Sequence, residues 1–193
     1  MSPHQAAFAA FAIWVLSWFA ASRWADPPAN RPAESEEWLY RALTFAGAAL
    51  AFGVVPKLSD ESRFQLWEFD RATKWVLFGV EVAGLLFTWW ARLHLGRLWS
   101  SGVTRKVDHR IIDTGPYGIV RHPIYSGLIV ALVAIAVQDG SLLTFAGVGV
   151  MTLGFFIKAR LEEKFLREQL GAEAYDSYRR RVPMLMPFGP KSA

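Results

Sequence analysis

Five apolar segments alternate with charged stretches along the chain. A helix needs about 20 apolar residues to cross the hydrocarbon core of a bilayer, and the first three segments approach that length. The last two would reach little more than about 20 Å each as helices, and only Asp139 and Gly140 separate them. The five segments are 5–22, 38–55, 75–95, 124–138 and 141–157. This pattern predicts an all-α integral membrane protein with about five transmembrane helices, of which the last two form a short hairpin. The charged stretch that follows predicts a cytoplasmic amphipathic helix.

The composition agrees with a membrane protein and excludes several kinds of site. Hydrophobic residues make up 53% of the chain, and the mean hydropathy is +0.21. The sequence contains no cysteine, which excludes disulfides, thiolate nucleophiles, iron-sulfur clusters and cysteine-ligated zinc. The net charge of +4 could indicate nucleic acid, but the basic residues flank apolar segments and no nucleic-acid module is visible. We therefore expect anionic lipid headgroups, and no nucleic acid, as the partner of these charges.

The distribution of basic residues predicts the orientation in the membrane. With five crossings, 17 of the 21 lysines and arginines fall on the side that holds the C-terminal stretch, and four fall on the opposite side. Cytoplasmic loops carry the excess of positive charge. We expect a multi-pass protein of the cytoplasmic membrane with its N-terminus outside and its C-terminal stretch in the cytoplasm.

A polar segment, 115–127, directly precedes the fourth apolar segment. It contains Arg121 and His122, together with Tyr117 and Tyr125 and several glycines and prolines. Charged groups at a membrane edge are costly unless they have a partner. The segment is therefore either an interfacial anchor that contacts lipid phosphates or one wall of a pocket for a polar ligand.

Two sequence blocks in the second half of the chain resemble a known family. The first, Gly-x-Tyr-x-x-x-Arg-His-Pro-x-Tyr, occupies 115–125. The second is a helix containing Glu162 and Glu163, followed by Gly-x-x-x-Tyr-x-x-Tyr-x-x-x-Val-Pro at 171–183. In this order, separated by a hairpin, they resemble the isoprenylcysteine carboxyl methyltransferase family and its phospholipid methyltransferase relatives over roughly 95–187.

The resemblance implies an integral membrane enzyme that binds S-adenosylmethionine and releases S-adenosylhomocysteine. The family's carboxylate for the methionine ammonium corresponds to Glu162. Lys158 stands where the family has an arginine that positions the acceptor. Residues 1–94 would then form the scaffold and acceptor side, and residues 95–193 the cofactor-binding half, of one structural unit. No metal site is implied. The implied cofactor-binding residues are His109, Arg110, Ile111, Ile112, Tyr117, His122, Pro123, Tyr125 and Glu162, and the implied catalytic residues are Arg121, Lys158 and Arg160.

Methyl transfer from a sulfonium requires positioning and the exclusion of water, with no nucleophilic residue of the protein. A carboxylate or thiol acceptor and a phospholipid amine all remain open, as does the oligomeric state. Two other classes also remain: a nicotinamide-dependent membrane reductase of sterol-reductase-like architecture, and a non-catalytic membrane protein. Because no Gly-x-Gly-x-x-Gly fingerprint follows a strand, soluble Rossmann-type binding is excluded for either enzyme.

Four further features have structural interpretations. Glu163 precedes Arg167 by one helical turn, which favours a surface ion pair between them. Glu81 lies inside the third apolar segment, where we expect it to be packed between helices. Small residues in 46–53 and at Gly147 and Gly149 favour close helix packing. We expect Tyr175 and Tyr178 to be packing residues and the arginines at 179–181 to contact lipid headgroups.

Overall fold

The computed structural model describes residues 1–24, 34–53, 65–99 and 111–191, and its regular elements there are all helices. One isolated antiparallel bridge joins Gln65 to Ser141. This confirms the predicted all-α class. The helices are α1 (Pro3–Ala21), α2 (Glu34–Ala51), α3 (Arg71–Leu95), α4 (Pro116–Ile119), α5 (Pro123–Asp139), α6 (Leu142–Leu170) and α7 (Ala172–Arg181), with 3-10 turns at Ser22–Trp24 and Gly96–Leu98.

The five apolar segments correspond to α1, α2, α3, α5 and the first part of α6. Local signals set their ends: Asp70 caps α3 by accepting from the amides of Ala72 and Thr73, and Gly140, in the left-handed conformation, ends α5. The fifth helix extends thirteen residues beyond the predicted apolar segment. Lysine, alanine, arginine, leucine and glutamate in 158–170 are strong helix formers, so the helix continues to Gly171.

The charged C-terminal stretch therefore differs from the expected separate amphipathic helix. Its first part is continuous with α6, and only its second part, α7, is a helix of its own. Within the described part of the chain, three segments are long and apolar enough to cross a membrane: α1, α3 with its following turn, and α6. With 17 residues, α5 is shorter, and α2 begins with several glutamates. The structure thus supports a membrane protein with three candidate spans among the described residues.

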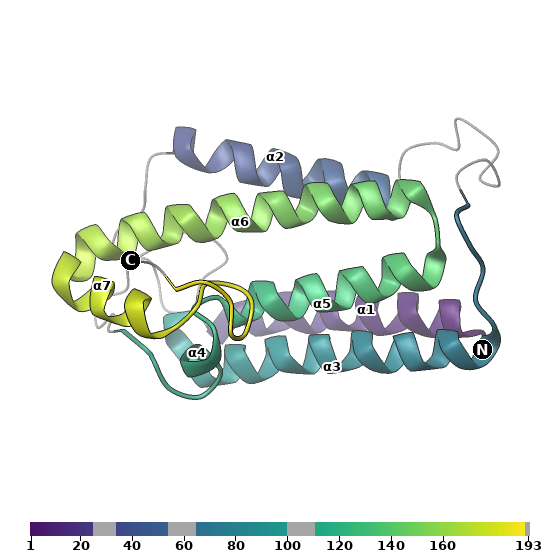
Figure 1. The fold of residues 1–193 in the computed structure, drawn as a ribbon, viewed down its shortest axis with the longest axis horizontal. Coiled ribbons are helices and arrows are strands. Elements are labelled where there is room, and N and C mark those ends of the chain that lie inside the picture. The colour runs from purple at the N-terminus through teal and green to yellow at the C-terminus, as the bar shows by residue number, and fades with distance from the viewer. Residues whose placement is uncertain (25–33, 54–64, 100–110, 192–193) are drawn as a thin grey trace.

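The helices form two layers (Figure 1). In one layer α2 packs along α6, and in the other α5 and α1 pack along α3. In both layers, glycines permit the close approach of the paired helices, α2 to α6 and α3 to α5. A Cβ atom on Gly147 of α6 would lie 2.6 Å from the carbonyl oxygen of Gly47 on α2, and a Cβ atom on Gly84 of α3 would lie 2.7 Å from that of Gly127 on α5. The predicted packing role is confirmed for Gly47 and Gly147, whereas Gly53 and Gly149 face open space.

The turn between α5 and α6 connects the two layers. A preceding segment crosses this turn: the Leu66 amide donates to the Gly140 carbonyl at 2.8 Å, and the Trp67 indole donates to the Val137 carbonyl at 3.0 Å. Buried apolar side chains fill the space between the layers near the turn, among them Leu132 and Met151. The opposite end, where α4 and α7 lie (Figure 1), is hollow and contains the candidate site.

Candidate functional site

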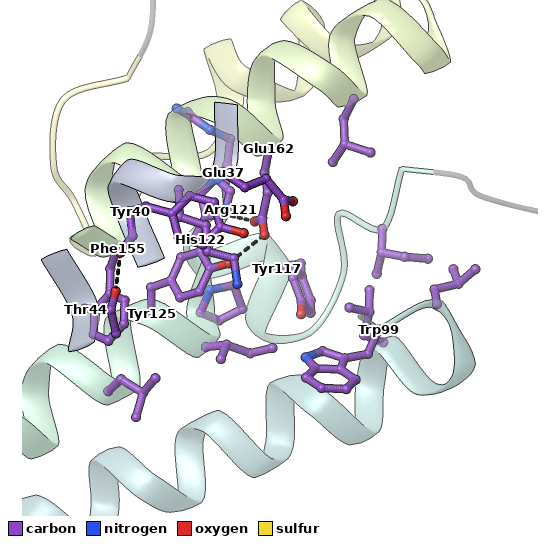
Figure 2. Close-up of a pocket in the computed structure, with 18 of the residues that line it drawn as sticks. Glu37, Tyr40, Thr44, Trp99, Tyr117, Arg121, His122, Tyr125, Phe155 and Glu162 are labelled. Carbon is purple, nitrogen blue, oxygen red and sulfur yellow. Dashed lines mark hydrogen bonds and ion pairs between the residues drawn. The ribbon is translucent and has the colours of Figure 1, made fainter. Parts of the chain in front are cut away.

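A cavity of about 610 Å³ lies between the two layers at the α4 and α7 end. Its volume falls in the range of ligand pockets, about 300–1,000 Å³. Side chains from α1, α2, α5, α6 and α7 line it, together with the end of α3 and residues 111–117. Figure 2 shows polar side chains from α2, α5 and α6 gathered at one part of its wall.

The Gly-Pro-Tyr turn places one wall of the cavity. Gly115 has a φ of 57°, and a Cβ atom there would lie 2.7 Å from Cε1 of His94, so only glycine fits this turn. Pro116 then begins the short α4, which buries Tyr117. The hydroxyl of Tyr178 on α7 donates to the Tyr117 carbonyl at 2.8 Å. Burial raises the pKa of Tyr117 and of Tyr178, so both phenols stay neutral.

Glu162 on α6 is one of the carboxylates that line the cavity. It accepts a hydrogen bond of 2.6 Å from the Tyr125 hydroxyl, and its Oε2 lies 3.4 Å from Nδ1 of His122. The other ring nitrogen of His122 lies 3.3 Å from Oε1 of Glu163. Burial alone would lower the pKa of His122, but its hydrogen bonds and charge interactions with the two carboxylates outweigh it and raise the pKa. His122 is therefore an imidazolium held between two carboxylates over a wider pH range than a free histidine.

Glu163 does not form the surface pair expected from the sequence. Its side chain is buried, with the residue 4% exposed, and Oε1 accepts from Nε of Arg121 at 2.7 Å. Nε of Arg179 lies 3.3 Å from its Oε2. Arg167 instead pairs with Asp176 of α7 at 2.9 Å. The prediction was wrong because α5 and α7 cover the face of α6 that carries Glu163, which spacing along α6 alone does not reveal.

The segment after α7 fixes the start of α5. The backbone carbonyls of residues 183 and 184 accept from the amides of Arg121 and His122 at 2.8 Å and 3.1 Å. The carbonyl of residue 185 accepts from the Ser126 hydroxyl at 2.6 Å, and that of residue 179 accepts from the Arg121 guanidinium at 3.1 Å. These bonds hold the Arg-His pair in one position, so that His122 faces Glu162.

The arginines at 179–181 have protein partners as well as exposed surface. Arg179 pairs with Glu163, and Arg181 pairs with Asp113 at 2.9 Å. The expected headgroup role is therefore wrong for Arg179, which belongs to the buried charge cluster. Tyr175 and Tyr178 pack with Val182, as expected. Both also line the cavity.

Lys158 lies on the cavity wall one turn before Glu162. Its ammonium is 5.4 Å from the ring centroid of Tyr40 on α2 and 5.4 Å from that of Tyr125 on α5. Both distances are within the range of a cation–π contact. The ring of Tyr125 in turn stacks between those of His122 and Phe155.

Tryptophans close the cavity on the side of α1 and α3. Trp14, Trp18 and Trp99 line it, and the Trp14 indole donates to Thr88 at 2.7 Å. Behind them the guanidinium of Arg92, which is buried, lies 3.4 Å from the ring centroid of Trp99. This wall is aromatic.

Most residues predicted for the site lie around this cavity. Arg160 is exposed and is not among its lining residues, and His109 and Arg110 lie outside the described residues. Glu81 lies apart from the cavity, fully buried in α3. The lining residues that were predicted are Ile111, Ile112, Tyr117, Arg121, His122, Pro123, Tyr125, Lys158 and Glu162.

The contribution of α2 was not predicted. Glu37, Tyr40 and Thr44 line the cavity, and Glu37 forms an ion pair with Arg41 of the same helix. The spacing of these residues places them on one helix face. A polar face in an apolar helix was therefore the signal available in the sequence.

Fold and site together define an all-helical membrane protein that encloses a polar and aromatic cavity of ligand size. The sequence model of the isoprenylcysteine carboxyl methyltransferase family matches residues 76–168. This segment, which holds the Arg-His-Pro block and both glutamates, is similar to that family. The resemblance expected from the sequence is confirmed.

Curated relatives match over similar lengths. Methanethiol S-methyltransferase 1 of Bradyrhizobium diazoefficiens is 44% identical over 72 residues, which are 37% of this chain and 24% of that protein. Methanethiol S-methyltransferase of Crocosphaera subtropica is 40% identical over 77 residues, 39% of this chain and 29% of that protein. Protein-S-isoprenylcysteine O-methyltransferase B of Arabidopsis thaliana is 31% identical over 87 residues, which are 45% of this chain and 44% of that protein. The matches thus span less than half the length of each of these relatives.

Proposed function

We propose that this protein is a membrane methyltransferase that uses S-adenosylmethionine to methylate a lipophilic or amphipathic acceptor. The observation that carries the proposal is that Glu162 and Lys158 lie on one face of α6, in a cavity that also has aromatic and apolar walls. The family match supports it, as do relatives named for methyl transfer to methanethiol and to isoprenylcysteine.

The lining residues fit this cofactor. A sulfonium, an ammonium, a carboxylate and an adenine need both charge signs and flat apolar walls. Glu162, oriented by Tyr125 and His122, would hold the ammonium. Tyr117, Ile111 and Ile112 would contact the nucleoside.

When bound, S-adenosylmethionine supplies an electrophilic methyl group, whose transfer to the acceptor leaves S-adenosylhomocysteine. The contribution of the protein is to position both reactants and to exclude water. The Arg121–Glu163 pair and residues 183–185 hold His122 and, through it, Glu162. The tryptophans of α1 and the loop after α3 keep the opposite wall apolar.

In the membrane, we expect the α4 and α7 end to face the cytoplasm, because most basic residues belong to that side. The bilayer would then surround one structural unit, with residues 1–94 on the acceptor side. A prenylcysteine-like carboxylate, a thiol and a phospholipid amine are the acceptor classes considered. A nicotinamide-dependent reductase is not favoured, since the relatives named above are methyltransferases.

Calorimetry in detergent tests the cofactor assignment. The purified protein should bind S-adenosylhomocysteine and not NADPH, and Glu162→Gln should weaken that binding at least about tenfold by removing a charge-assisted hydrogen bond. Glu168→Gln, an exposed glutamate of the same helix, is the matched control. Binding of NADPH alone, or equal affinities for the two variants, would contradict the proposal.

A further inference from the structure

The segment after α7 displays two large apolar side chains on its outer side. From α7 it turns back toward α4 and the start of α5 (Figure 1). Phe188 is fully exposed, and Met186 is 70% exposed. The Gly189 amide donates to the Met186 carbonyl at 2.9 Å, so both side chains belong to one tight turn. Neighbouring exposed apolar side chains with polar residues around them mark sites that contact proteins or membranes.

Phe188 also has an unfavourable backbone conformation. Its φ is 62°, in the left-handed region that bulky side chains rarely adopt. In the part of the chain that the structure describes, it is the one residue other than glycine with a positive φ. Strained residues persist where their surroundings hold them, yet the ring of Phe188 has only solvent around it. We therefore expect a partner that removes this ring from water.

The bond that anchors the segment shows what adjoins it. The carbonyl of residue 185 accepts from the hydroxyl of Ser126, in the first turn of α5, at 2.6 Å. Ser126 is buried, whereas Val130 and Val133, which follow it on the same face of α5, are exposed. Since α5 is an apolar helix, this valine face is a surface that α5 offers to lipid. The segment thus lies where that face begins.

The charge of the segment fits the surface of a bilayer. Residues 177–191 include four basic residues and no acidic one, and two of the four, Arg180 and Lys191, are exposed. Aromatic and apolar side chains with basic ones beside them are typical of segments that lie at the boundary between headgroups and acyl chains. There lysine and arginine are attracted to the phosphates.

We propose that this segment docks on the lipid bilayer: Phe188 and Met186 insert at the boundary between headgroups and acyl chains, and Arg180 and Lys191 contact phosphates. Insertion removes both apolar side chains from water. The inference goes beyond the methyltransferase function proposed above and does not depend on it.

The same segment holds part of the candidate site. Its carbonyls at residues 183 and 184 accept from the amides of Arg121 and His122. One residue separates the Ser126 anchor at residue 185 from the start of the exposed turn. A bilayer that holds the turn therefore also holds these carbonyls against the Arg-His pair, so docking should keep both amides protected.

The absence of cysteine from the chain allows a label to be placed at a single position. Phe188→Cys with a nitroxide label is measured in nanodiscs of phosphatidylcholine and phosphatidylglycerol. Collisions with oxygen, which is concentrated in lipid, are compared with collisions with a water-soluble nickel chelate. Val133→Cys is the reference for lipid, and Glu173→Cys, exposed on α7, is the reference for water. The ratio of oxygen to nickel collisions at residue 188 should exceed that at residue 173 at least about threefold.

Hydrogen exchange in the same nanodiscs measures the link to the Arg-His pair. Phe188→Ser removes the apolar ring, whereas Phe188→Trp keeps an aromatic side chain that suits the membrane interface. The amides of Arg121 and His122 should exchange at least about threefold faster in Phe188→Ser than in the unmodified protein or in Phe188→Trp. Amides in the middle of α5 are the internal control and should not change.

Each measurement has a result that would overturn the inference. A label at residue 188 as accessible to nickel as the label at residue 173 would place the segment in water. Dipolar broadening between labels at residue 188 would assign this surface to a second copy of the chain. Unchanged exchange of the Arg121 and His122 amides in Phe188→Ser would refute the link to the site. None of these measurements uses a cofactor or an acceptor, so their failure would leave the proposed function intact.

Discussion

Glu163 offers the sharpest test of the buried charge cluster. In Glu163→Ala, the Arg121 guanidinium loses the carboxylate with which it pairs. The Arg121 side chain, 2% exposed, stays enclosed by α6, α7 and the segment that follows α7. Arg179 loses the same partner. A buried charge without its counter-charge is one of the few changes that destabilise a protein strongly.

The magnitude follows from the contacts that remain. Removing one partner of a buried ion pair costs about 3–5 kcal/mol. Arg121 keeps the carbonyls of residues 179 and 182 as acceptors, which places the expected cost near the lower limit, about 3 kcal/mol. For a chain of this length each kcal/mol lowers the unfolding temperature by about 2–4 °C. The expected decrease is therefore about 6–12 °C.

Thermal unfolding in detergent, followed by the fluorescence of the nine tryptophans, measures this effect. Glu168→Ala on the same helix is exposed and should change the unfolding temperature by less than about 2 °C. The double variant Arg121→Met with Glu163→Leu should recover part of the loss, because apolar residues can replace a buried ion pair. Equal unfolding temperatures for Glu163→Ala and Glu168→Ala would refute this account of the cluster.

Two further predictions concern the layers and the pH dependence. Gly147→Ala should destabilise the protein by about 1–3 kcal/mol, because the new methyl group meets backbone atoms of α2. Gly149 faces open space, so Gly149→Ala should leave the stability unchanged. Equal unfolding temperatures for the two variants would contradict this packing. The raised pKa of His122 means that its imidazolium stabilises the fold fully below about pH 6.5 and that this contribution is lost as the pH rises through the higher folded pKa. The unfolding temperature should therefore fall as the pH rises above about 6.5, and it should fall less in His122→Asn. An equal or steeper fall in the variant would count against the imidazolium.

The helices could be predicted from the sequence where they coincide with apolar segments. In the described residues, a helix covers most of each of the five apolar segments. The end of α6 was not predictable from hydropathy, since the helix continues through charged residues as far as Leu170. Helix propensity, and not apolar character, determines where such a helix ends.

The site was predictable where its residues are neighbours in sequence or belong to a motif. His122, Tyr125 and Glu162 do meet, as the two blocks suggested. The role of Glu163 depends on Arg121, 42 positions earlier in the chain, and that of Tyr40 depends on how closely α2 approaches α6. The spacing of residues along one helix shows which of them share a face. It does not show which other helix packs against that face.

The two layers also imply an order of assembly. Once α5 has been synthesised, α1, α3 and α5 are all present, whereas α2 must wait for α6, which begins at Leu142. Until then the face of α2 that carries Glu37 and Tyr40 has no protein to cover it, and charged side chains are costly in lipid. The cavity can therefore form only after α6 and α7 have been synthesised and α6 has packed along α2.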